Sequence, residues 1–166
     1  MNTPKKILLG IGVLGLQLVL SELLAIDQIR PDFLLIFVLY ISIVEGSTTG
    51  VVFGFALGLF EDVLSAGSLM GLAPLTKSVT GFLAGKLQGQ FPRMNPVVFH
   101  LVWIGIILFH FGLYLYVRLQ SLLDASPVLF WKTWGFTVLY TLVFIAILQI
   151  IVPLPRLAVS SSGEHR

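Results

Sequence analysis

The chain has 166 residues, of which 57% are hydrophobic and only 11% are charged, and its formal net charge is +2. A soluble domain uses about a quarter of its residues for Asp, Glu, Lys and Arg, so this composition excludes an ordinary water-soluble protein. The lack of cysteine excludes disulfides and thiolate chemistry, and the small net charge gives no indication of a nucleic-acid partner. At roughly 20 apolar residues per spanning helix, the length predicts an all-α polytopic membrane protein with about six transmembrane helices and no separate aqueous domain.

Six apolar segments are predicted to span the membrane as one helical bundle. The first follows two lysines but has no signal-peptide cleavage site, which indicates a span that is retained. Pro31 and Asp32 favour a helix start, because Pro at the first helical position needs no N–H partner and Asp complements the helix dipole. Pro92 and Pro96 indicate a loop. The predicted spans cover about residues 7–26, 31–46, 48–62, 69–88, 97–117 and 129–152 of a single domain at 1–155, followed by a polar cytoplasmic tail at 156–166.

The second and third of these segments are short for a membrane span. A helix of about 15 residues covers about 22 Å, whereas the hydrocarbon core is about 30 Å thick. Either these helices extend into the polar break between them, or the bilayer is thinner around them.

The basic residues between the spans predict the orientation of the chain. With both termini in the cytoplasm, six basic residues lie inside and three outside, which agrees with the positive-inside rule. The sequence therefore predicts a multi-pass membrane protein with cytoplasmic termini. The basic residues assigned to the inside are Lys5, Lys6, Lys86, Arg93, Arg156 and Arg166, and those assigned to the outside are Arg30, Arg118 and Lys132.

Glycines recur every four residues in two of the predicted helices. Small residues at this spacing form a stripe along one helix face and let two helix backbones approach closely in lipid. We expect the stripes to pack two helices within the chain, in preference to forming a groove for another subunit or a ligand. The first stripe contains Gly46, Gly50, Gly54 and Gly58, and the second contains Gly81, Gly85 and Gly89.

Lys77 lies near the middle of the fourth predicted span. A lysine at the bilayer centre costs about 2.5 to 3.5 kcal/mol on insertion scales, so a partner or a water-filled cavity is expected. Asp62 is the first candidate, because both residues continue the glycine stripes and a short turn joins their helices. The alternatives Glu22, Glu61 and Glu45 remain open. We favour a structural ion pair that fixes helix register over a small-molecule or proton site.

No arrangement of residues in the sequence predicts catalysis, a metal or a cofactor. His100 and His110 are ten residues apart, about 1000° of helix rotation, and therefore do not share one helix face. The HExxH and GxSxG motifs are absent, and the adjacent carboxylates of Glu61 and Asp62 diverge by about 100° on a helix. The sequence predicts a protein that is not an enzyme.

One stretch of the chain resembles a known family. The pattern G-x-x-x-G-F-x-x-G-L-x-x-D at residues 50–62 is preceded by Arg30-Pro31-Asp32 and Glu45-Gly46, and is followed by Gly71, Gly81 and Gly85. This combination resembles the bacterial rod shape-determining MreD family. The match by motif covers about residues 30–87, and the remainder agrees in length, number of spans and orientation.

The resemblance implies a six-helix scaffold in the machinery that elongates peptidoglycan. The implied partners are MreC, which has one span and a large outer domain, actin-like MreB filaments, the glycosyltransferase RodA and a class B transpeptidase. The family is also similar in structure to the substrate-binding components of energy-coupling-factor vitamin transporters, which supplies a rival: a transporter subunit whose cavity includes Asp62 and Lys77. Membrane lipid is a further expected contact, and self-association remains open.

Overall fold

The computed structural model describes residues 3–25, 29–64 and 69–152. Within these ranges the chain forms seven α-helices and one short 3-10 helix, and no β-strand, which confirms the predicted all-α class. The elements are α1 (Thr3–Leu23), α2 (Phe33–Glu45), α3 (Ser47–Leu64), α4 (Leu72–Gly85), η1 (Phe91–Arg93), α5 (Pro96–Arg118), α6 (Gln120–Ala125) and α7 (Pro127–Ile151).

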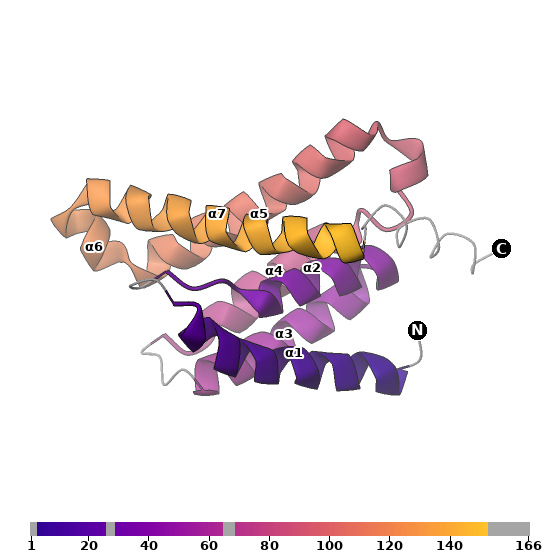
Figure 1. Ribbon diagram of the computed structural model, residues 1–166, viewed down its shortest axis with the longest axis horizontal. Helices are drawn as coiled ribbons and strands as arrows, with labels where there is room; N and C mark the ends of the chain where they lie inside the picture. Colours follow the sequence, from indigo (N-terminus) through magenta and orange to yellow (C-terminus); the bar gives the residue numbers. More distant parts are fainter. Residues whose placement is uncertain (1–2, 26–28, 65–68, 153–166) are drawn as a thin grey trace.

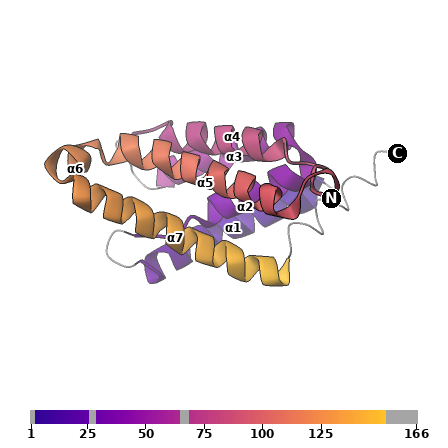
Figure 2. The same cartoon turned by 90° about the horizontal axis from the view of Figure 1, so that it is seen from above.

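The long helices run alternately between the two ends of an elongated bundle (Figure 1). The view from above shows that α5 and α7 are joined by α6 at one end and diverge toward the other end (Figure 2). We call the end where α1 begins and α7 finishes the terminal end, and the opposite end the α6 end. Helices α1 and α3 also finish, and α2 and α4 begin, at the α6 end.

Local sequence sets where several helices begin and finish. The Asp32 side chain accepts a hydrogen bond from the Leu35 N–H at 2.7 Å and so caps α2. Gly46 ends α2 with a φ of 93°, which residues with a side chain rarely adopt, and α3 begins at the next residue. The Asn95 side chain caps α5, where Pro96 occupies the first turn and needs no N–H partner.

The short helix α2 is the central element of the bundle. Most of its side chains are buried, including Leu34, Leu35, Leu39 and Ile43, none of which has any exposed surface. It packs against α1, α3, α4 and α7. A helix that is apolar all round and enclosed by other helices agrees with the near-continuous run of apolar residues in its sequence.

Helix lengths differ in part from the predicted spans. In the described ranges, α3, α5 and α7 are long and apolar enough to cross a membrane by length and composition. By contrast, α2 has 13 residues and α4 has 14, about 20 Å each at 1.5 Å per residue. Helix α4 is therefore shorter than the predicted fourth span at 69–88, because Gly71 has a positive φ and the helical bonding gives way to turns after Gly85. The number of spans remains a prediction.

Within the described residues, the structure adds one α-helix that the sequence did not predict. Helix α6 lies between the fifth and sixth predicted spans and has no fully buried residue, so no apolar periodicity indicated it. The predicted cytoplasmic tail at 156–166 lies outside the described residues.

Candidate functional site

Lys77 binds two carboxylates in the interior of the bundle. Its Nζ lies 2.7 Å from Asp32 Oδ2 and 2.7 Å from Glu61 Oε2, and the lysine side chain has no exposed surface. The three residues come from α4, from the N-cap of α2 and from the last turns of α3. We call them the charge cluster. One ammonium and two carboxylates give the cluster a formal charge of −1.

The direction of Lys77 follows from the direction of α4. Side chains on a helix tilt toward its N-terminus, and α4 begins at the α6 end. The long lysine side chain therefore extends toward that end, where α2 begins and α3 finishes. Asp32 uses both carboxylate oxygens, since Oδ1 caps α2 while Oδ2 binds Lys77.

The expected ion pair between Lys77 and Asp62 is not formed. Asp62 Oδ2 instead accepts a hydrogen bond from the Gly71 N–H at 2.6 Å, across the turn that joins α3 to α4. Because neighbouring residues on a helix diverge by about 100°, Glu61 points into the bundle while Asp62 points to the turn. Glu61 was one of the open alternatives.

Of the two remaining alternatives, the structure places only Glu45, and Glu45 does not meet Lys77. Glu45 lies at the terminal end, where its Oε2 is 2.7 Å from Lys6 Nζ. The side chain of Glu22 lies outside the described part of the structure. The sequence reasoning missed Asp32, which was assigned only a capping role. The sequence did contain a signal for Asp32. It precedes an apolar helix, and if successive helices alternate in direction, the start of that helix lies at the same end of the bundle as the end of α3.

The two glycine stripes lie against each other where α3 crosses α4. A Cβ on Gly54 would lie 2.5 Å from the backbone oxygen of Lys77, and one on Gly58 would lie 2.5 Å from Cα of Pro74. Gly50 and Gly81 face each other, and a Cβ on either would meet the backbone of the other. These glycines therefore let the backbones of α3 and α4 come into direct contact at Lys77.

The outer members of the stripes have different surroundings. A Cβ on Gly85 would meet the backbone of Ser47 and Gly46, so Gly85 extends the close contact to the start of α3. A Cβ on Gly46 would lie 2.5 Å from the side-chain oxygen of Gln88. Gly89 was expected to continue the helical stripe, but it lies in the turn after α4 with a φ of 66°.

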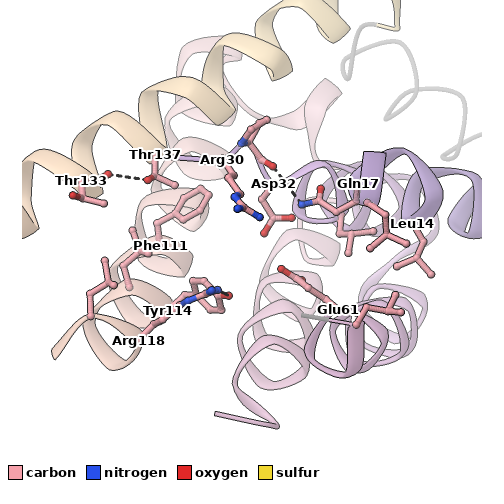
Figure 3. A pocket seen from close by; sticks show the side chains of 16 residues that line it. Leu14, Gln17, Arg30, Asp32, Glu61, Phe111, Tyr114, Arg118, Thr133 and Thr137 are labelled. Atoms are coloured by element: carbon pink, nitrogen blue, oxygen red, sulfur yellow. Dashed lines mark hydrogen bonds between the residues drawn. The ribbon is translucent and has the colours of Figure 1, made fainter. Parts of the chain in front are cut away.

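A cavity of about 610 Å³ adjoins the charge cluster at the α6 end. Asp32 and Glu61 line it together with residues of α1, α5 and α7 (Figure 3). Arg30 and Arg118 also line it, as do the hydroxyl-bearing side chains of Thr133 and Thr137. The sequence did not predict this cavity, because its walls come from five separate segments.

His110 on α5 contacts Thr80 on α4, one turn along α4 from Lys77. Its Nδ1 lies 2.9 Å from Thr80 Oγ1, and its ring stacks on Tyr114 at a centroid distance of 5.9 Å. His100 bonds to Trp103 on a separate part of α5. In the described part of the chain, no group of three or more His, Asp or Glu side chains is placed to hold a metal ion.

Several helices present apolar side chains on the outside of the bundle, while the charge cluster is enclosed. Phe55 on α3, Leu101 on α5 and Leu139 on α7 are each more than half exposed. An outward apolar surface with an inward charge cluster defines a helical integral membrane protein. A family model described as rod shape-determining protein MreD matches residues 7–154. The chain therefore belongs to the MreD family and is a rod-shape-determining membrane protein. No curated protein and no solved structure matches the chain.

Proposed function

We propose that this chain is a non-catalytic membrane scaffold that maintains rod cell shape by binding an MreC-like single-span protein. In this role it organises the peptidoglycan elongation complex in the bacterial inner membrane, together with MreB, RodA and a class B transpeptidase. The family match over residues 7–154 carries the proposal.

The charge cluster supports a structural role for the interior. Lys77 is held by Asp32 and Glu61, so one side chain fixes α4 against both α2 and α3. The close backbone contact at Gly54 and Gly58 also fixes α3 against α4. An interior used in this way leaves partner recognition to the outer helix faces and the short connections.

Helix α5 offers a face for a partner helix. The contact between α3 and α4 already uses Gly50, Gly54, Gly58, Gly81 and Gly85. A Cβ on Gly105 or Gly112 would instead meet nothing within 4 Å. These two glycines are seven residues apart, about two helix turns, and therefore lie on one face of α5. We propose that the single span of the MreC-like partner approaches α5 along this face.

Cysteine crosslinking in cells tests the proposed interface. The chain has no cysteine, so Gly105→Cys and Gly112→Cys each place one thiol on it. With single cysteines along the span of the MreC-like partner, we expect disulfide crosslinks from both positions. Gly135→Cys on α7 is the matched control, because its site is also open. Absence of crosslinks from α5, with normal protein levels, would refute the α5 interface.

Capture of the partner tests the scaffold role itself. Gly105→Leu combined with Gly112→Leu is expected to remove partner capture and rod shape while the purified chain stays folded. Co-purification from native membranes, followed by mass spectrometry of proteins and small molecules, separates this role from the transporter alternative. A vitamin-like ligand bound at one molecule per chain, with no MreC-like protein, would overturn the scaffold proposal.

A further inference from the structure

We propose that the cavity at the α6 end binds a phosphate-bearing headgroup between Arg30 and Arg118. The inference does not depend on the scaffold role, since it rests on the charges, hydroxyls and apolar rim of the cavity (Figure 3).

Two arginines supply the charge for an anion. Arg30 precedes α2 and Arg118 ends α5, so two segments that are far apart in the sequence bring them to the same cavity. Within residues 3–25, 29–64 and 69–152, neither guanidinium forms an ion pair with a carboxylate, because Asp32 and Glu61 bind Lys77 instead. With the charge cluster at −1, the two arginines give this region a formal charge of +1.

The surroundings of Arg118 hold its guanidinium in place. Arg118 donates a hydrogen bond to the Tyr114 hydroxyl, and its guanidinium lies 5.6 Å from the centroid of the same ring. Since the Tyr114 oxygen accepts this bond, its own proton remains available to donate. The guanidinium keeps further N–H groups in the planar arrangement that matches phosphate oxygens. The Thr133 hydroxyl on α7 is another donor in the cavity wall.

Apolar side chains at the rim favour an amphiphilic ligand. Leu18 on α1 is 46% exposed and Leu64 on α3 is 49% exposed, and both line the cavity. A volume of about 610 Å³ lies in the usual range for small-molecule sites and exceeds what a single phosphate occupies. A phospholipid headgroup satisfies both observations, with its phosphate at the arginines and its acyl chains along the leucines. A soluble phosphate ester could bind the arginines through its phosphate, but it has no acyl chains to contact the leucines.

Native mass spectrometry of the delipidated full chain tests the proposal. We expect dioleoyl phosphatidylglycerol to bind with one molecule per chain, and dioleoylglycerol, which lacks phosphate, to bind at least tenfold more weakly. Arg30→Gln with Arg118→Gln should weaken phosphatidylglycerol binding by roughly tenfold or more, about 1.4 kcal/mol. The matched control is Lys86→Gln with Arg93→Gln, which removes two positive charges at the terminal end and should leave binding unchanged.

A second arm identifies the source of the phosphate. Glycerol 3-phosphate should compete only weakly with phosphatidylglycerol if the ligand is a lipid, and equally well if it is a soluble phosphate ester. The proposal is overturned if dioleoylglycerol binds as tightly as phosphatidylglycerol, or if the two double variants lose binding equally. Melting temperatures of both variants establish that each is folded, and Arg118→Lys with Arg30→Lys should restore part of the lost affinity.

Discussion

At the scale of single residues, Lys77 should be the most sensitive charged position in the chain. Lys77→Met leaves Asp32 and Glu61 facing each other in the interior without the ammonium that both contact. Removing one partner from a buried ion pair costs about 3–5 kcal/mol, so we expect a loss of that size in the free energy of unfolding in detergent micelles. Lys86→Met is the control, because Lys86 is exposed and its ammonium lies over the Phe82 ring; this substitution should cost about 1 kcal/mol or less.

The same cluster predicts a specific rescue. Lys77→Met combined with Asp32→Asn and Glu61→Gln removes all three charges, and replacing a whole buried ion group with neutral residues is often neutral in stability. We expect this triple variant to unfold at a denaturant concentration close to that of the unchanged protein. Stability as low as that of Lys77→Met alone would mean that the lost packing of the lysine stem, and not the orphaned carboxylates, explains the effect.

Asp32 and Asp62 should respond differently to the same substitution. Asp62→Asn keeps an oxygen that accepts from the Gly71 N–H, so it should cost about 1 kcal/mol or less. Asp32→Asn keeps the oxygen that caps α2, but it removes one charge that holds Lys77. We expect Asp32→Asn to cost at least twice as much in unfolding free energy. Equal costs for the two variants would contradict the observed pairing.

At the scale of elements, the glycines of α3 and α5 should tolerate a methyl group differently. A Cβ on Gly54 would lie 2.5 Å from the Lys77 carbonyl oxygen, so Gly54→Ala must push α3 and α4 apart. Such overpacking costs about 1–3 kcal/mol. Gly105→Ala meets open space, so it should be neutral or stabilise α5 by up to about 1 kcal/mol. Unfolding in detergent measures both, and a destabilised Gly105→Ala would argue against an open α5 face.

The sequence predicted elements better than it predicted contacts between them. Apolar runs located α1, α2, α3, α5 and α7, and the four-residue glycine spacing indicated the two helices that meet most closely. The end of α4 was missed, because Gly85 and Gly89 fit one helical spacing although only Gly85 lies in the helix. The partner Asp32 of Lys77 was missed because the short connection between the two helices favoured Asp62, near the end of α3. Selecting Asp32 required knowing that α2 lies in the centre, beside both α3 and α4.

At the scale of the whole molecule, the alternating helices divide the polar residues between two ends. The terminal end carries Lys6 and Glu45 as an ion pair, and the loop that contains Lys86 and Arg93 lies there too. The α6 end carries the charge cluster and the cavity. This separation makes membrane orientation decisive for the cavity, because it determines which leaflet and which compartment can supply a ligand.

The orientation can be measured with single cysteines in the cysteine-free chain. Ser121→Cys lies on α6 and Pro92→Cys lies in η1, and both positions are exposed. Because the predicted cytoplasmic set of basic residues is the larger one, a membrane-impermeant maleimide should label Ser121→Cys in intact spheroplasts. Pro92→Cys should react only after the membrane is opened. The reverse pattern would place the cavity on the cytoplasmic side. Equal labelling of both sites would contradict the alternating passage of the helices through the membrane.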